Sequence, residues 1–204
     1  MLRFCDLSVE QFNSIQPLWE RQREFHVSCT AYFAEDVRRR RFDERKAELL
    51  AKAGASGLHV DVCYAVEGEA GDVVEVPAVG EGRAGDEAKG FAELRAGGGR
   101  IVGYCVSSIS GGADSAGAHT AGPDYAGRVG EIDSLFVLDE FRGRGIGTEL
   151  VRRALVWLRE REPGQIIVVA LAENVAATEF YKRFGLMPRA VVSELVRETD
   201  SGAC

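Results

Sequence analysis

The chain has no long hydrophobic run, and its cysteines follow no regular spacing. None of its 204 residues lies in an apolar stretch near the roughly 18 that a membrane-spanning helix needs, and the N-terminus carries no signal-peptide stretch. Five cysteines are an odd number, which argues against the disulfide framework of a small secreted domain. We therefore expect a cytoplasmic protein without a membrane partner.

Basic residues are in the minority. Lysine and arginine number 25 against 32 acidic residues, for a net charge of −7. A protein that coats nucleic acid needs charge of the opposite sign, so we expect no nucleic-acid partner. Metal-ligand groupings are equally scarce, because His26 and Cys29 have a ligand-like spacing but lack a second pair. No metal is expected.

Length and composition indicate a single domain over residues 1–204. With 46% apolar residues, the chain has enough material for one sizeable core. Two stretches, 67–99 and 111–127, are rich in glycine, alanine and acidic residues and poor in large apolar ones. Because this composition does not offset the entropy cost of ordering, both are expected to be long flexible loops.

Hydrophobic periodicity predicts the other elements. A capping box of Ser8 with Gln11 starts a helix, and Gly54 ends a second one. The continuous apolar run 165–171 is typical of a strand buried on both faces. Strands are expected at 2–6, 58–66, 100–110 and 165–171, helices at 8–25, 34–53, 148–162 and from 174, and an extended segment at 187–197. This order predicts an α/β (mixed α+β) fold, a mixed sheet with helices on both faces.

The most informative motif is a glycine-rich turn between an apolar strand and a helix. Glycine lets the backbone turn tightly and approach a ligand, and the first N–H groups of the helix attract an anion such as phosphate. A P-loop is excluded because no lysine precedes Thr148, and a dinucleotide turn because its sixth position is not glycine. No serine-hydrolase elbow is present. The turn consists of Arg142, Gly143, Arg144, Gly145, Ile146 and Gly147.

The pattern Arg-x-x-Gly-x-Gly at 142–147 resembles the acyl-CoA pyrophosphate loop of the GNAT family of N-acetyltransferases. Residues 131–141 are similar to the family's central strand and short acidic turn, and residues 174–185 to its Asn-x-x-Ala-x-x-Phe-Tyr helix and following Phe-Gly. The resemblance implies the GNAT acyl-CoA N-acyltransferase fold, with a central, mostly antiparallel mixed sheet. It also implies acetyl-CoA as co-substrate and direct acetyl transfer to a primary amine.

The resemblance also assigns a donor site. The turn, extended to Thr148, would hold the CoA diphosphate by its backbone amides. The backbone of Leu135, Phe136 and Val137 would pair with the pantetheine arm, and an N–H near Val137 would polarise the thioester carbonyl. Asn174 matches a position that touches the cofactor, and it is also a good helix N-cap.

Three side chains are candidates for proton transfer. Tyr181 matches the family's acid, and a phenol keeps its proton at neutral pH. Glu131 and Asp133 lie two residues apart on one strand, hence on one face and about 6.6 Å apart along it. Either is a candidate base, and solvent is the alternative. Val169 stands where other family members have a base glutamate.

The leading interpretation is therefore an N-acetyltransferase acting on a small molecule or on a protein or peptide. A catalytically silent acyl-CoA sensor on the same fold is the alternative, and a nucleotide-binding protein is a third. By the resemblance, the junction at 27–33 between the first two helices overhangs the acceptor. The sequence leaves the acceptor and the oligomeric state open, a homodimer included.

Overall fold

A computed structural model describes residues 2–54, 57–65, 99–110 and 128–195. The predicted insertions, 67–99 and 111–127, lie outside the described residues except for residue 99. The strands are β1 (Leu2–Leu7), β2 (Leu58–Ala65), β3 (Arg100–Ser110), β4 (Val129–Val137) and β5 (Gln165–Val168). The α-helices are α1 (Gln16–Cys29), α2 (Ala34–Arg39), α3 (Phe42–Ala53), α5 (Ile146–Arg159) and α6 (Val175–Lys182), and the 3₁₀ segments are η1 (Val9–Ile15) and η3 (Asp139–Phe141).

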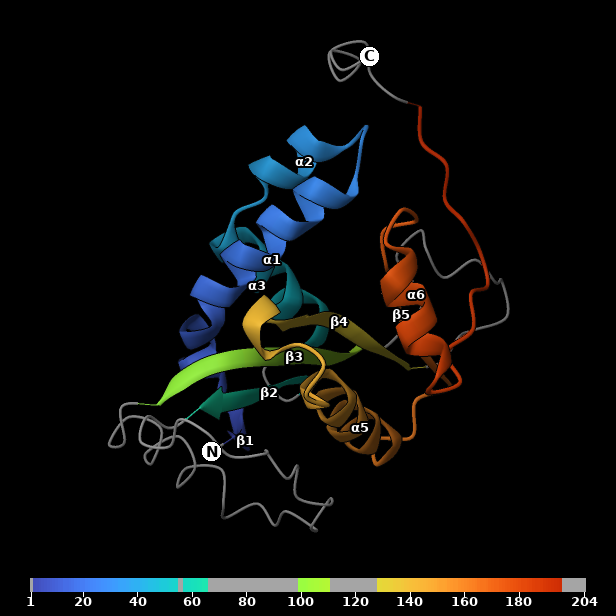
Figure 1. Cartoon of the computed structure of the whole chain (residues 1–204). Helices are drawn as coiled ribbons and strands as arrows, with labels where there is room; N and C mark the ends of the chain where they lie inside the picture. The colour runs from blue at the N-terminus through green and yellow to red at the C-terminus, as the bar shows by residue number, and fades with distance from the viewer. Residues whose placement is uncertain (1, 55–56, 66–98, 111–127, 196–204) are drawn as a thin grey trace.

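The five strands form one mixed sheet in the order β1-β2-β3-β4-β5. Neighbours from β1 to β4 are antiparallel, whereas β4 and β5 are parallel. Figure 1 shows α1 and α3 on one side of this sheet and α5 on the other. The mixed sheet with helices on both faces was predicted from the element order, and the structure confirms it. No helix in the described part of the chain is long and apolar enough to cross a membrane.

A β-bulge in β4 shapes the centre of the sheet. Val106 of β3 lies opposite Ser134, and Ser107 lies opposite Ile132, so Asp133 is the extra residue on β4. A bulge leaves its extra residue outside the ladder and changes which side chains share a face. Side chains that strict alternation would separate are therefore brought to the same side of β4.

The apolar stripes predicted for the helices form the core. The inward side chains of α5 are Ile146, Leu150, Val151, Ala154, Leu155 and Leu158, all buried. On the opposite face, the Phe42 ring of α3 packs against Phe12 at 5.7 Å and against Trp19 at 5.6 Å between centroids. These contacts fix α3 and α1 over the sheet. They also determine which polar residues of the two helices reach β4.

The two N-terminal helical stretches are more broken than the periodicity predicted. Residues 9–15 form a 3₁₀ segment, and α1 starts only at Gln16, with a proline in its first turn where the missing N–H costs nothing. The predicted cap is present, because the Gln11 side chain accepts from the Ser8 N–H at 2.9 Å. The second stretch is divided at 40–41, where the Arg40 carbonyl accepts from Arg23 of α1 at 3.0 Å.

The C-terminal elements differ most from the prediction. The strand predicted at 165–171 ends at Val168, and its residues are half-buried, so the prediction of burial on both faces is wrong. Among the described strands β5 lies at the sheet edge and pairs only with β4, and Val169 beyond it is 56% exposed. Residues 187–195 of the predicted extended segment belong to no strand of the described sheet, and residues 196–197 lie outside the described part.

Candidate active site

The glycine turn has the backbone geometry of an anion site. Gly143 and Gly145 have φ of +77° and +78°, in the left-handed region that residues with a Cβ rarely adopt. Gly145 is the N-cap of α5, and its carbonyl accepts the first ladder bond, from the Glu149 N–H at 3.0 Å. The N–H groups of Ile146, Gly147 and Thr148 thus have no partner in the helix ladder. They form the positive end of its dipole.

The arginines of the turn are engaged by the protein itself. Arg142 donates from Nε to the Val137 carbonyl at 3.1 Å and forms an ion pair of 2.8 Å with Asp139. Its guanidinium also lies 5.0 Å from the centre of the Phe25 ring. Arg144 lies 5.3 Å from the Phe141 ring centre and is exposed. Any anion held here is therefore held chiefly by the backbone amides.

The C-terminal half of β4 presents an open edge. Pairing with β5 ends at Ile132 opposite Val168. The Leu138 N–H donates to the Val102 carbonyl at 2.9 Å, toward β3. Because bonding direction alternates along an antiparallel strand, Leu135 and Val137 direct their N–H and C=O groups away from β3.

Side chains already use the outward carbonyls of this edge. Gln22 of α1 donates to the Leu135 carbonyl at 3.2 Å, and Arg142 donates to that of Val137. Both contacts confirm that the carbonyls point away from β3. The outward N–H groups of Leu135 and Val137 are thus the groups of this edge that an extended ligand can use without displacing Gln22 or Arg142.

The two sequence motifs and the β4 edge meet at Gly147. A Cβ built on Gly147 would lie 3.5 Å from the Phe180 ring of α6 and 3.9 Å from a Val137 methyl group. The structure thus brings the glycine turn, the edge at 135–137 and the helix of Tyr181 together. Asn174 caps that helix as predicted, since its side-chain oxygen accepts from the Ala177 N–H at 3.1 Å.

Tyr181 is buried beside the β4 edge. It is 7% exposed, and its ring packs edge-on against Phe180 at 5.3 Å. Burial, and then the nearby Cys105 thiol, raise the pKa of Tyr181 above its ordinary value. Tyr181 and Cys105 belong to one core cluster, and Leu135 and Val137 of the β4 edge pack against that cluster. Tyr181 therefore stays protonated at neutral pH.

Glu131 and Asp133 share one face, as predicted, and they also share one cation. Lys52 Nζ of α3 lies 2.6 Å from Glu131 Oε2 and 2.9 Å from Asp133 Oδ1. Arg45 contacts Asp133 at 3.5 Å. The Asp133 side chain is fully buried, whereas that of Glu131 is 17% exposed. Glu131 is therefore the carboxylate with access to an incoming group.

Sequence reasoning missed Gln22 and Lys52. Gln22 is buried and accepts hydrogen bonds from the Tyr104 hydroxyl and from Ser134 Oγ. A signal was available for both, since Gln22 continues the apolar stripe of α1 between Trp19 and Phe25, and Lys52 stands three residues after the buried Leu49. A polar side chain in phase with an apolar stripe needs a buried partner.

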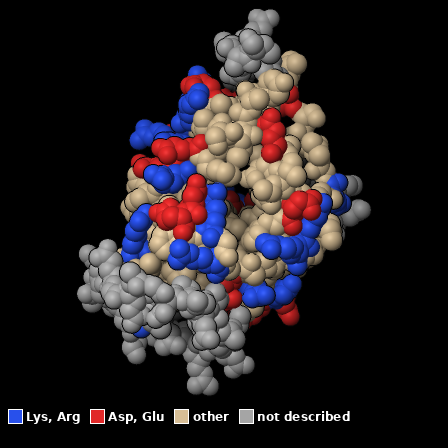
Figure 2. Space-filling model, in the orientation of Figure 1, with Lys and Arg blue, Asp and Glu red and all other residues tan. Residues whose placement is uncertain are grey.

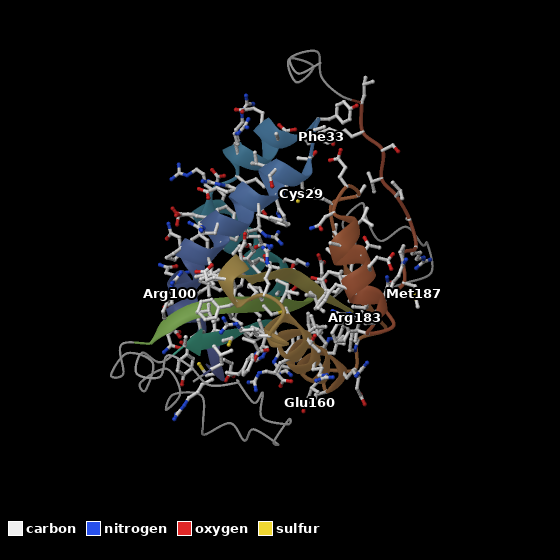
Figure 3. The ribbon with its side chains drawn as sticks, in the orientation of Figure 1. Cys29, Phe33, Arg100, Glu160, Arg183 and Met187 are labelled. Carbon is white, nitrogen blue, oxygen red and sulfur yellow. The ribbon has the colours of Figure 1, made fainter. Side chains whose placement is uncertain are left out.

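Figure 2 shows a hollow in the surface between α1 and α6, with acidic atoms visible inside it. The junction between α1 and α2 borders it, because the Ala31 N–H donates to Glu173 in the loop before α6 at 3.5 Å. Figure 3 shows Cys29 and Phe33 on this junction, at the end of α1 away from the sheet. The hollow remains open in Figure 2.

Comparisons with known proteins agree with this geometry. The acetyltransferase (GNAT) family matches residues 69–186, more than half of the chain. An uncharacterized N-acetyltransferase of Methanocaldococcus jannaschii is 41% identical over 69 residues, which cover 34% of this chain and 30% of that protein. N-alpha-acetyltransferase 30 of Schizosaccharomyces pombe is 36% identical over 56 residues, 28% of this chain and 37% of that protein. The matched stretch is thus about a third of either relative.

Among solved structures, the fold resembles an aminoglycoside N-acetyltransferase in complex with CoA. The TM-score is 0.52 at 13% sequence identity, with 96% of this chain and 99% of the other covered. At this identity the likeness supports the fold. Taken with the family match, the fold and the meeting of the two motifs at Gly147 lead to one conclusion: the chain belongs to the acetyltransferase (GNAT) family, a family of acyltransferase enzymes.

Proposed function

We propose that this protein transfers the acetyl group of acetyl-CoA directly to a primary amine of a small molecule, a protein or a peptide. The observation that carries the proposal is the packing of Phe180 and Val137 around Gly147. This packing joins an anion site, an open strand edge and a buried phenol in one place. Each of the three matches one part of a thioester that bears a diphosphate.

The donor would lie along this line of groups. The amides of residues 146–148 would hold the diphosphate at the start of α5. The pantetheine arm would pair with the edge at 135–137 as an added strand. The Val137 N–H would then donate to the thioester oxygen and stabilise the negative charge that develops there. The cap of α6 uses only the side-chain oxygen of Asn174. The two N–H groups of the same amide would therefore bond to acetyl-CoA.

Transfer would need three proton movements. Glu131 would accept the proton of the acceptor ammonium, directly or through water, and Asp133 is too buried for the same role. The neutral amine would attack the carbonyl carbon, so a C–N bond forms and the C–S bond breaks. Tyr181, whose pKa is raised by burial, would donate its proton to the departing thiolate. The second proton that the nitrogen loses as the amide forms would then return to the Tyr181 phenolate, directly or through water.

Amine-dependent release of free CoA thiol tests the proposal. The panel holds acetyl-CoA constant and varies the acceptor among amino acids, polyamines, aminoglycosides and peptides with a free N-terminus or lysine. The named relatives acetylate two of these classes, aminoglycosides and protein N-termini, by their names. Thiol release with any of the amines supports the enzyme. Binding of acetyl-CoA without turnover on the whole panel supports a silent sensor instead.

Gly145→Ala is expected to raise the dissociation constant of acetyl-CoA about tenfold. Alanine at a φ of +78° costs about 1–2 kcal/mol, so the turn relaxes and its amides no longer converge on the diphosphate. Isothermal titration calorimetry measures the change.

Gly54→Ala is the matched control. Gly54 also has a positive φ, +65°, and nothing lies within 4 Å of an added Cβ. Gly54→Ala strains a positive-φ backbone position at the end of α3, away from the turn, and acetyl-CoA affinity should not change. Wild-type affinity in Gly145→Ala would show that these amides do not anchor the donor.

A further inference from the structure

We propose that Lys52 of α3 is a positioning residue for acetyl transfer, whose ammonium holds the Glu131 carboxylate beside Asp133 in the place where it takes the proton of the acceptor. The inference rests on the proposed function and deepens it. Lys52 lies 79 residues before Glu131 in the sequence. The inference therefore adds α3 to a site whose sequence motifs all lie within residues 131–181.

The contact geometry is that of a bridging cation. Lys52 Nζ lies within hydrogen-bonding distance of both carboxylates, at 2.6 Å from Glu131 and 2.9 Å from Asp133. The Lys52 side chain is 25% exposed, and the two carboxylates are less exposed than that. Water therefore screens this contact less than it would screen a surface ion pair.

Two carboxylates in contact with one ammonium must lie close to each other. Without a cation, like charges this close oppose each other's ionisation, and one of the pair takes up a proton. A protonated carboxyl cannot serve as a base. Lys52 removes this obstacle, because an opposite charge at hydrogen-bonding distance favours the ionised form of both groups.

Loss of Lys52 should act on Glu131 more than on Asp133. Arg45 remains 3.5 Å from Asp133, and among the described residues it forms no ion pair with Glu131. In the ladders around Glu131, the opposing residues are the uncharged Ser108 of β3 and Ile167 of β5. Glu131 thus has Lys52 as its one cationic contact among the described residues.

Two titratable side chains of β3 near the cluster are neutral. Burial raises the pKa of both Tyr104 and Cys105, so neither carries charge at neutral pH.

The charges that face Glu131 are those of Asp133, Lys52 and, through Asp133, Arg45. Arg45 also pairs with the exposed Glu48 of α3 at 3.4 Å. Removing Lys52 therefore leaves the two carboxylates of β4 with Arg45 as their one cation among the described residues, and Arg45 is shared with Glu48.

The test is the pH profile of kcat/KM for Lys52→Met with acetyl-CoA and the best amine of the panel. Because Glu131 must be ionised to act, and because two close carboxylates lose the ammonium that they share, the acid limb should move to higher pH by about one to two units. The variant should fall about tenfold below wild type near the foot of the limb. It should regain most of its activity at high pH.

Two variants serve as controls. Lys52→Arg keeps the positive charge and should restore the wild-type limb. Lys46→Met removes a lysine of the same helix that bonds to Asn13 instead, and it should leave the profile in place. Acetyl-CoA binding by calorimetry confirms that each variant is folded. A loss of activity that is equal at every pH would overturn the inference and mark Lys52 as purely structural.

Glu131→Gln separates failure of the inference from failure of the proposed function. If Glu131→Gln loses the acid limb while Lys52→Met keeps the wild-type one, the base assignment stands and the role of Lys52 is wrong. If Glu131→Gln retains full activity and the wild-type limb, the proposed base is wrong. If no amine supports thiol release by the wild-type protein, the acetyltransferase proposal itself fails.

Discussion

Tyr181→Phe is expected to lower kcat for amine acetylation by at least about 100-fold, the contribution typical of a positioned general acid. Phenylalanine keeps the ring that packs against Phe180 but removes the proton that the departing thiolate needs. The affinity for acetyl-CoA should change little, because the proposed anchors are backbone groups of the turn and of β4. Steady-state kinetics with thiol detection and calorimetry separate the two quantities.

The pH dependence of the same reaction adds a second readout. Burial raises the pKa of Tyr181 above its ordinary value, so the acid form is present over the whole range of a practical assay. Deprotonation of Tyr181 should therefore produce no basic limb below about pH 10, the ordinary pKa of a phenol. A basic limb below that value which disappears in Tyr181→Phe would contradict the burial of this group.

Tyr32→Phe is the matched control for the loss of a hydroxyl. Tyr32 is 55% exposed and lies on the junction between α1 and α2, which borders the hollow at the end of α1 away from the sheet. Its hydroxyl has no assigned part in proton transfer, so kcat should stay near that of the wild-type protein, and any effect should appear in the KM of the acceptor. Wild-type kcat in Tyr181→Phe would remove this residue from the mechanism and leave solvent as the proton donor.

The local backbone geometry of the proposed donor site could be predicted because its information is local. Glycines that turn the backbone and an N-cap at Asn174 act within a few residues of themselves. The positive φ values at Gly143 and Gly145 and the cap on Ala177 confirm those local predictions. Gly147 and Phe180 pack against each other, and each lies on a helix that is predicted from its own local sequence.

The acceptor side could not be predicted in the same way, because its contacts join distant segments. Whether a carboxylate on β4 is free or ion-paired depends on where α3 lies, and the position of α3 depends on packing of Phe42 against Phe12 and Trp19. Sequence spacing placed Glu131 and Asp133 on one face but did not identify Lys52. The bulge at Asp133 is likewise visible only in the register of β3 and β4.

The edge strand β5 shows the limit of composition as evidence. Residues 165–171 form an unbroken apolar run, which predicts cover on both faces. The structure ends the strand at Val168, with half-buried residues. An apolar run reports that burial would be favourable, but the neighbours available in the fold decide whether it occurs. Among the described strands, β5 has a neighbour on one side alone.

The far face of the sheet contains a second buried ion pair, and it supports the largest stability prediction. Asp61 of β2 is fully buried, and Arg153 of α5 donates to its Oδ1 at 2.7 Å. His59 Nε2 lies 3.0 Å from the other carboxylate oxygen, and the His59 ring stacks on Trp157 at 4.8 Å. The pair thus ties α5, whose N-terminus forms the glycine turn, to the centre of the sheet.

Arg153→Met is expected to lower the free energy of unfolding by about 3–5 kcal/mol, because it leaves a buried carboxylate without its cation. Urea denaturation followed by circular dichroism measures the loss. Arg159→Met, in the last turn of the same helix, should change stability by less than about 1 kcal/mol, since Arg159 is exposed. The double variant Asp61→Asn/Arg153→Met should recover part of the loss, since the buried charge is then absent. A loss in Arg153→Met no larger than in Arg159→Met would show that water reaches Asp61 and that this ion pair does not hold α5 to the sheet.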